Sequence, residues 1–407
     1  MQVPDSTPDR APADAATLRG SNQSGMRAHN ERLVLSLVRQ HGALAKSDIA
    51  RMTGLSAQTV SVIMRALEQD GLLKRGEPIR GKIGQPSVPM SLQAGGAFFL
   101  GLKIGRRSAD LVLVDFLGQV RGTHRRTYRY PTPAAVVAFV TEALPGLMAV
   151  LPAAQRDRVS GMGVAMPFQL WSWVKTIGAP QAEMDAWRNY DMQAELAAAT
   201  DLPVYVQNDA TSACGAELVF GTGERPKDFL YFYFGTIIGG GLVLNGQLFL
   251  GRSGNAAGVG PMPVMGPGGQ MKRLLDVASL SVLADLMEAA NEPSDHLWEA
   301  PDRWLVSDAV LSAWLDIAAE GLASAVLSAS TLLELEAVLI DGWMPVTVRA
   351  EVTRRTSEAL SRLDLSGIAP PQVREGTVGA QARSLGAAAI PLSQRYLIDQ
   401  NAAARNA

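Results

Sequence analysis

The chain is poor in cysteine and histidine. Cys214 is its one cysteine, and its four histidines are widely separated along 407 residues. A single thiol excludes an internal disulfide and a zinc site built from several thiolates. The scattered imidazoles show no spacing typical of metal ligands. The sequence therefore predicts no metal site.

Long apolar stretches are also missing. No run of about 18 apolar residues occurs, and no basic segment followed by an apolar core opens the chain. These absences predict a cytoplasmic protein with no membrane partner. Hydrophobic residues make up 47% of the sequence, so most of it should fold, in about three units for this length. Residues 1–25 are rich in Pro, Asp, Ala, Ser and Thr, which predicts a disordered tail.

Residues 26–92 have the pattern of a winged helix-turn-helix domain. Three short amphipathic segments come first, with Gly54 and Leu55 as a turn and Ser56 as the cap of the third. Their inner faces would be Val34, Leu37 and Val38, then Ile49 and Met52, then Val60, Ile63, Met64 and Leu67. The outer face of the third helix would then enter the major groove of DNA.

A basic, glycine-containing loop leads into a strand expected at 88–92, which together resemble a β-wing. Its cations would lie against phosphates or in a minor groove. Residues 26–92 carry ten lysines and arginines against five acids, whereas the whole chain has a net charge of −2. A basic module on an acidic body favours DNA binding over the alternative, a plain three-helix bundle with a solvated face. The residues expected to contact DNA are Lys46, Ser56, Gln58, Thr59, Ser61, Arg65, Arg80 and Lys82.

From Ala97 onward, strands and helices alternate. The expected strands cover 98–105, 108–114, 159–165, 203–206, 229–235, 239–244 and 336–341, and the expected helices cover 133–151, 191–200, 209–220, 270–290 and 307–334. This alternation predicts an α/β architecture with helices packed on mixed sheets.

Two segments are more specific. A strand–Asn–Asp–helix junction occupies 203–221, and a glycine-rich hairpin and loop occupy 235–260. The glycines at 235 and 239–241 would let backbone amides approach a phosphate, or would supply the positive φ of a tight hairpin. With the hairpin at 100–118 and the closing SLGAAAIP at 384–391, these segments resemble the ROK family (repressors, open reading frames and kinases) of the actin-like ATPase superfamily.

The resemblance implies a fold and a domain order. The body would be an α/β, actin-like ATPase (ribonuclease H-like) structure of two lobes, preceded by the all-α/winged-helix DNA-binding domain. We expect the first lobe to comprise 93–208 plus 384–407, and the second lobe 209–383. In kinases of the family, the Asp matching Asp209 takes a proton from a sugar hydroxyl and the Asn matching Asn208 binds a neighbouring hydroxyl. The alternative for Asp209 is a helix N-cap.

Departures from the family pattern argue against catalysis. Where family kinases carry a metal-organising Asp and a glycine-rich phosphate loop, this chain has Lys103-Ile104-Gly105-Arg106-Arg107. Phosphoryl transfer depends on charge neutralisation by the metal, so we expect no enzyme activity and no nucleotide cofactor. Asp341-Gly342-Trp343 replaces a glycine pair that packs on adenosine, and Gly258-Val259-Gly260-Pro261 replaces the usual Glu-x-Gly-His.

Other groups could hold a ligand in place of the missing ones. Trp171, Trp173 and Trp187 lie within 17 residues, and aromatic faces stack on sugar rings. These aromatic side chains could equally pack the lobe surface. For Arg106 and Arg107, a solvated turn is favoured over contact with a phosphorylated ligand. The residues expected to bind the ligand are Asn208, Asp209, Trp187, Arg188, Gly254 and Asn255.

The sequence therefore predicts a transcriptional regulator of carbohydrate genes, most often a repressor in this family. It would bind a pseudo-palindromic operator as a homodimer or homotetramer and sense a sugar-like effector between the lobes. One alternative is an active sugar kinase with a fused DNA-binding module. Another is a ligand-independent DNA-binding protein whose body serves only oligomerisation or docking.

Overall fold

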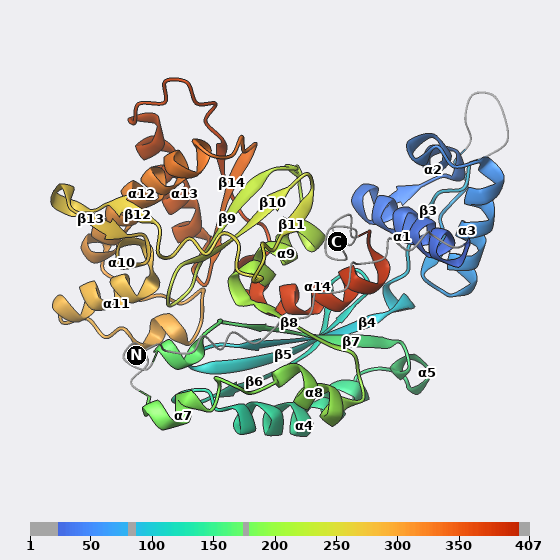
Figure 1. Ribbon diagram of the computed structural model, residues 1–407, viewed down its shortest axis with the longest axis horizontal. Coiled ribbons are helices and arrows are strands. Elements are labelled where there is room, and N and C mark those ends of the chain that lie inside the picture. The colour runs from blue at the N-terminus through green and yellow to red at the C-terminus, as the bar shows by residue number, and fades with distance from the viewer. Residues whose placement is uncertain (1–22, 80–86, 174–178, 399–407) are drawn as a thin grey trace, which may run out of the picture.

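The computed structural model describes residues 23–79, 87–173 and 179–398. In Figure 1 the N-terminal module lies at one end of the long axis, beside two lobes that each contain a sheet. The module is built from α1 (Gln23–His41), β1 (Ala43–Leu44), α2 (Lys46–Thr53), α3 (Ala57–Gln69), β2 (Leu73–Arg75) and β3 (Met90–Leu92). Its strands pair in the order β1-β3-β2.

The core of the module follows the predicted helical spacing except at Leu37 and Met52. Leu37 is only half-buried, and Leu35, which was not predicted, is 2% exposed and belongs to the core instead. All four inner residues predicted for α3 are buried, and Ser56 accepts a hydrogen bond from the Thr59 amide at 3.1 Å. The prediction that Met52 anchors the second helix is wrong, because its side chain is 40% exposed. Helix α2 has only about two turns, and the fully buried Ile49 already fills its inner face.

The first lobe contains a five-stranded mixed sheet of order β6-β5-β4-β7-β8. Its strands are β4 (Phe98–Ile104), β5 (Ser108–Asp115), β6 (Val120–Thr127), β7 (Val159–Met166) and β8 (Val204–Asn208). Strands β4 to β6 are antiparallel, whereas β4, β7 and β8 are parallel. Helices α4 (Pro133–Ala149) and α8 (Met192–Thr200) cover one face of the sheet, and α14 (Ala382–Tyr396) packs on the other.

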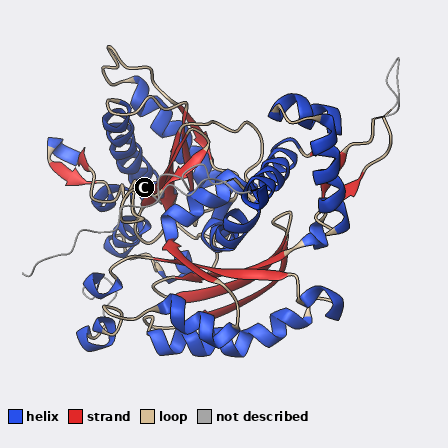
Figure 2. Cartoon of the chain, turned by 45° about the vertical axis from the view of Figure 1, so that its right-hand side comes forward, coloured by secondary structure: helices blue, strands red, loops and turns tan. Residues whose placement is uncertain are grey.

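The second lobe repeats the same strand order with a different part of the chain, β11-β10-β9-β14-β15. The strands are β9 (Phe229–Phe234), β10 (Gly239–Leu244), β11 (Gln247–Phe249), β14 (Ala337–Gly342) and β15 (Gln372–Glu375). Helix α9 (Asp209–Phe220) covers one face, while α12 (Asp308–Ser330) and α13 (Val346–Ser361) belong to the core on the other face. Figure 2 shows helices covering the strands of both sheets. This duplicated arrangement confirms the predicted two-lobed, actin-like α/β body; the residue bounds given for the lobes stay a prediction.

The prediction of one helix over 270–290 is wrong. A short hairpin of β12 (Pro263–Met265) and β13 (Met271–Arg273) comes first, followed by α10 (Leu275–Ala278) and α11 (Leu280–Ala289). The break falls at Ser279, whose backbone is extended. Ser279 Oγ accepts a hydrogen bond from the Ile238 amide at 3.1 Å, so this residue serves the neighbouring β9–β10 turn.

By length and composition α12 could span a membrane, but half of its apolar window is buried in the protein, and Trp314 and Ala318 on it are fully buried. It is the central helix of the second core.

Helix α14 joins the lobes, because it packs on the first sheet and also crosses α9. A Cβ on Gly386 would lie 1.8 Å from the Ser212 carbonyl oxygen, so the two helices meet backbone to backbone.

Candidate functional site

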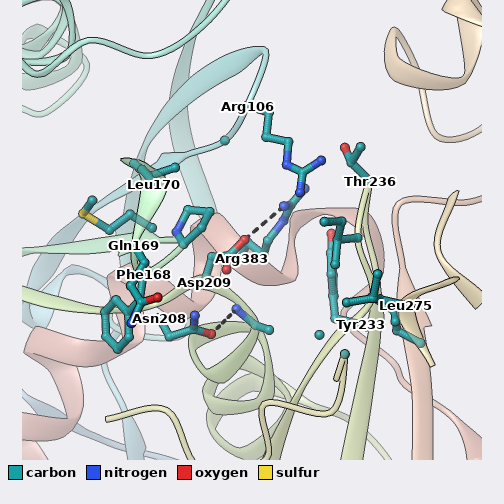
Figure 3. Close-up of a pocket in the computed structure, with 18 of the residues that line it drawn as sticks. Arg106, Phe168, Gln169, Leu170, Asn208, Asp209, Tyr233, Thr236, Leu275 and Arg383 are labelled. Carbon is teal, nitrogen blue, oxygen red and sulfur yellow. Dashed lines mark hydrogen bonds and ion pairs between the residues drawn. The ribbon is translucent and has the colours of Figure 1, made fainter. Parts of the chain in front are cut away.

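A cavity of about 1120 Å³ lies between the lobes. Its walls come from the β4–β5 turn, the loop after β7, the β8–α9 junction, the β9–β10 turn and the start of α14. Figure 3 shows Asn208, Asp209 and Arg383 pointing toward its centre, with Arg106 above them. Of the predicted ligand residues, Asn208, Asp209, Trp187, Arg188 and Asn255 line this cavity.

The Asn208–Asp209 pair is held by two separate contacts. Asn208 Oδ1 accepts hydrogen bonds from the Ala210 and Thr211 amides at 3.0 and 3.1 Å, so Asn208, and not Asp209, is the N-cap of α9. Asp209 Oδ2 lies 3.2 Å from Arg383 Nη1, and both side chains are more than four-fifths buried. The amide nitrogen of Asn208 and the second oxygen of Asp209 remain to offer a ligand one donor and one acceptor.

Arg383 is the most important site residue that the sequence analysis missed. Its guanidinium lies over the Tyr233 ring at 4.9 Å, in addition to the ion pair with Asp209. Arg383 and Asp209 are 174 residues apart and meet only because α14 and α9 cross. No local pattern marks an arginine at a helix start as a ligand residue, so sequence spacing could not have found it.

Lys103 lies inside a ladder of charges across three strands. Its Nζ is 2.9 Å from Asp110 Oδ2 and 3.0 Å from Ser108 Oγ, and Arg125 Nε is 3.4 Å from Asp110 Oδ1. Lys103, Asp110 and Arg125 are direct partners in the β4–β5 and β5–β6 registers. Burial, with repulsion by Arg383, lowers the pKa of Lys103 to about 8 despite the opposing effect of Asp110. The first-lobe side of the cavity therefore presents the ammonium group of Lys103, paired with Asp110.

The two arginines after this lysine differ from each other. Arg107 is exposed, lies 3.7 Å from Asp295 and stacks over Trp298 at 5.8 Å. Arg106, in contrast, is only 8% exposed and lines the cavity. The prediction of a solvated turn is therefore wrong for Arg106, because its side chain is directed into the cavity toward Arg383. Burial lowers the pKa of Arg106 to about 9, while Asp209 opposes the shift.

The tryptophans divide between core and cavity. Trp187 is 4% exposed, and its Nε1 donates to the Pro131 carbonyl at 3.0 Å, so it mainly packs the first lobe and shows one edge to the cavity. Trp171 also lines the cavity, and Arg188 stacks over its ring at 5.6 Å. The side chain of Trp173 lies outside the described residues. Phe168 is a further aromatic lining residue that the sequence analysis did not single out.

The glycine run after β9 serves packing. A Cβ on Gly239 would lie 2.6 Å from Ala210 Cβ, and one on Gly241 would lie 2.3 Å from Cys214 Cβ. These glycines therefore let α9 lie directly on β10. None of residues 235 and 239–241 has a positive φ, so the interpretation as a tight hairpin that needs positive φ is wrong. The approach of backbone amides to a phosphate stays a prediction, and Gly239 and Gly240 do line the cavity. Gly254, also predicted to bind the ligand, has a φ of +74° and lies beside Phe168, next to the lining residue Asn255.

Asp341 and Trp343, which were expected to replace a glycine pair of the kinases, both bind other parts of the protein. Asp341 is fully buried and accepts hydrogen bonds from Tyr231 Oη at 3.0 Å, the Gly379 amide at 2.8 Å and Arg349 Nη1 at 3.2 Å. Trp343 Nε1 donates to the Leu297 carbonyl at 2.9 Å, and Arg125 of the first lobe stacks over its ring at 5.2 Å.

Within the described residues, no three His, Cys, Asp or Glu side chains gather as a metal site.

The second candidate surface is the exposed side of α3. Gln58, Val62 and Arg65 are exposed at positions i, i+4 and i+7, so they form one stripe opposite the buried face. Lys46 Nζ donates to Ser61 Oγ at 3.0 Å, and the Ser56 and Thr59 hydroxyls lie 2.8 Å apart, so these four predicted contacts partly bind one another. Arg80 and Lys82, at the predicted wing tip, lie outside the described residues.

The module is joined to the body through α1. Arg39 Nη2 donates to the Phe116 carbonyl at 2.5 Å, and its guanidinium lies 5.1 Å from the Phe116 ring and 5.9 Å from the Phe220 ring. Phe116 follows β5 in the first lobe, whereas Phe220 ends α9. One arginine of the module therefore contacts both sides of the junction between the lobes.

Comparisons with known proteins agree with this architecture. The ROK family model matches residues 99–392, and a winged helix-turn-helix DNA-binding model matches residues 27–74. An uncharacterized protein y4fQ of Sinorhizobium fredii is 24% identical over 90% of this chain and 91% of its own length. The xylose repressor of Bacillus subtilis is 20% identical over 60% of this chain; the match spans 62% of the repressor, somewhat less than two thirds of its length.

Among solved structures, a ROK family transcriptional regulator described as a homolog of the Escherichia coli MLC protein superposes with a TM-score of 0.66. It is 21% identical, and the match covers 91% of this chain and 97% of that chain. At this identity the likeness shows the fold, including the position of an N-terminal module before a two-lobed body.

Proposed function

Since the chain belongs to the ROK family, we propose that it acts as a DNA-binding transcriptional regulator, a repressor of carbohydrate uptake or catabolism genes, and not as a sugar kinase. The observation that carries this proposal is the pairing of an exposed recognition stripe on α3 with Lys103 in the cavity. A regulator requires the first feature, and the second opposes phosphoryl transfer. The relatives named as a xylose repressor and a transcriptional regulator support a regulatory role. In this role the protein would act in the cytoplasm, where it would bind its operator.

The stripe on α3 suits direct contact with bases. Glutamine pairs with adenine, arginine with guanine, and an apolar side chain contacts the thymine methyl group. Val62 is 53% exposed between Gln58 and Arg65, and an apolar residue there has no packing role within the described module. Operator specificity is therefore proposed to come from these three residues, with Lys46 and the wing contributing contacts to phosphates.

Gln58→Ala is expected to weaken operator binding by about 1–3 kcal/mol and to relax preference at one base pair. Gln69→Ala is the matched control, because Gln69 is exposed on the last turn of the same helix, away from the turns nearest the base edges. Binding is measured by fluorescence anisotropy on the operator and on a mutated operator at one salt concentration. Equal losses from the two variants would mean that the first turns of α3 are not the ones nearest the base edges. Unchanged operator binding by Gln58→Ala would mean that another face of α3 enters the groove.

The response to an effector follows from linkage. A ligand that binds one lobe arrangement better than another shifts the protein toward that arrangement, and operator affinity changes with it. Asn208 and Asp209 lie at the start of α9, while Phe220 at its end touches the module's Arg39. The cavity and the module are thus joined by one rigid helix. A homodimer or homotetramer would place two modules on the two half-sites of a pseudo-palindromic operator.

The second candidate function is sugar phosphorylation, and Asp209 is the observation that favours it. We expect no transfer of phosphate from Mg-ATP to glucose, mannose, xylose or N-acetylglucosamine above background, because Lys103 and Arg383 surround the place where metal and base would act. A coupled assay measures this, with the Asp209→Asn variant as control. Turnover by the wild type that disappears in this variant would overturn the regulator-only proposal.

A further inference from the structure

The N-terminal module shares one continuous core with the first lobe. Leu73 and Leu92 of the module and Phe99 of β4 belong to the same cluster of buried apolar side chains. The connection between module and lobe, residues 93–97, consists of the 3₁₀ turn Ala94–Gly96 and one residue on each side. Domains move relative to each other where few contacts cross an exposed linker, so the shared core favours one fixed placement of the module.

The short connection is held on both of its sides. On the lobe side, the Ala94 carbonyl accepts a hydrogen bond from the Phe116 amide at 3.0 Å. On the module side, a Cβ on Gly96 would lie 2.8 Å from the carbonyl oxygen of Gly71, in the turn that follows α3. The two backbones therefore touch with no side chain between them.

Arg158 ties the C-terminal end of the recognition helix to the first lobe. It comes directly before β7, and its own carbonyl accepts a hydrogen bond from the Phe98 amide of β4 at 3.0 Å, so its backbone is fixed in the sheet. Its Nη1 donates to the Asp70 carbonyl at 3.5 Å, to that of Gly95 at 3.3 Å and to that of Gly96 at 3.4 Å. One guanidinium of the body thus bonds to the end of α3 and to the connection.

A cation at this place is favoured by the helix itself. Helix α3 ends with Asp70 as its C-cap, and its last turn carries no basic residue of its own. The carbonyls at a helix C-terminus carry partial negative charge, which a nearby cation stabilises. Gly71 has a φ of +74°, and a Cβ there would lie 2.8 Å from Arg158 Nη1, so the absence of a side chain lets the guanidinium reach these carbonyls. The body therefore supplies the cation that the helix lacks.

We propose that Arg158 is a positioning residue for operator recognition, which fixes the half-site spacing that the protein accepts. This inference rests on the proposed regulatory function and on its paired modules. The shared core holds the strands of the module, and Arg158 fixes the tilt of α3 on the first lobe. Two recognition helices in an oligomer then have one separation, which the DNA must match. Each added base pair also turns one half-site by about a tenth of a helical turn, so a fixed pair of helices discriminates sharply.

The first test measures affinity for duplexes that differ only in half-site spacing. The probes are labelled duplexes with the two half-sites that the wild-type protein selects from random-sequence DNA, with up to five base pairs inserted between them. We expect two inserted base pairs to weaken the wild type at least tenfold, but to weaken Arg158→Met, which keeps the apolar stem, less than threefold. An Arg158→Met protein with the spacing preference of the wild type would overturn the inference, as would a wild type that tolerates every spacing.

Base preference within a half-site distinguishes positioning from a general loss of structure. Arg158→Met should keep the wild-type base preference, because the stripe on α3 is unchanged. Gln58→Ala should show the reverse pattern, with an altered base preference and the wild-type spacing preference. A variant that loses its fold would lose both preferences together, and melting curves of each variant check this independently.

Two further variants test the guanidinium itself. Arg156→Met removes an exposed cation two residues away, whose Nε donates to the Leu151 carbonyl of the same loop at 3.3 Å, and it should behave as the wild type does. Arg158→Lys keeps the charge and should restore part of the spacing preference. Equal effects of Arg156→Met and Arg158→Met would contradict the proposal.

A second measurement needs no DNA. Cys214, the only cysteine, is fully buried, so spin labels can be attached selectively at exposed positions through Arg51→Cys on α2 and Ala138→Cys on α4. We expect one narrow distribution of distances between the two labels when Arg158 is present and a broader one in Arg158→Met. Equal widths would show that Arg158 does not fix the module and would overturn the inference.

The DNA experiments separate this inference from the regulator proposal. If half-sites are bound with a clear base preference but at any spacing, the regulator proposal stands and the inference fails. If the protein prefers no DNA sequence at all, both fail. A sharp spacing preference in the wild type that disappears in Arg158→Met, with base preference intact, supports both.

Discussion

Gly386→Ala is expected to destabilise the protein by at least about 3 kcal/mol, at the upper end of the cost of overpacking a core. The added Cβ would lie 1.8 Å from the Ser212 carbonyl oxygen and 3.0 Å from the Ala213 amide nitrogen. Both are backbone atoms of α9, so no side chain can turn away to make room. Helices α9 and α14 would have to separate, and the lobes they belong to would separate with them. The melting temperature should fall by roughly 6 °C or more.

Gly215→Ala is the matched control for this prediction. Gly215 also lies in α9 near the same junction, but its added Cβ would meet only Leu248 Cδ2, at an ordinary contact distance of 3.4 Å. Alanine is favoured over glycine in a helix by about 1 kcal/mol, so this variant should be as stable as the wild type or more so. Equal destabilisation by the two variants would show that the lobes do not depend on the close crossing at Gly386.

Local patterns predicted the module well. The spacing of Val60, Ile63, Met64 and Leu67 determines the buried face of α3, because a helix of 13 residues has only one side on which four apolar residues can meet. The same reasoning failed for Met52, because in a short helix one fully buried residue already makes the contact. It failed again at 270–290, where the Ser279 hydroxyl binds the backbone of another segment and the helix is interrupted.

The cavity was predicted only in part, because its charges come from distant segments. The Asn208–Asp209 junction was recognisable, since its strand, cap and helix are contiguous. Arg383 reaches Asp209 only through the crossing of α9 and α14, and the buried Arg106 comes close enough to feel the charges of both only in the folded protein. A hairpin turn with two arginines resembles a solvated loop when considered alone. The cavity's positive charge is therefore a property of the tertiary structure.

The contact between module and body indicates how ligand binding could reach DNA. Arg39 is half-buried, and desolvation lowers its pKa to about 10 while nearby Arg225 acts in the same direction. It bonds to the Phe116 carbonyl and stacks between Phe116 and Phe220. Since Phe220 and Asp209 are the two ends of α9, any tilt of this helix caused by a ligand at Asp209 moves the surface on which Arg39 rests.

Arg39→Met is expected to leave operator affinity within a few-fold of the wild type but to reduce the effect of a bound effector on it. A bound effector typically changes the affinity for the other ligand about 5- to 150-fold. In Arg39→Met the ratio of operator affinities without and with effector should fall close to one, because methionine keeps the apolar bulk but loses the bond to Phe116. Arg39 is on α1, away from the recognition stripe of α3, so direct contacts to bases are unaffected. Arg27→Met, an exposed change on the same helix, is the control and should respond as the wild type does. The measurement is the fluorescence anisotropy of labelled operator DNA with and without saturating ligand.

An Arg39→Met protein that still releases its operator fully would show that the signal takes another route. The first candidates are the hydrogen bonds from Arg158 to the backbone of Asp70 and Gly96.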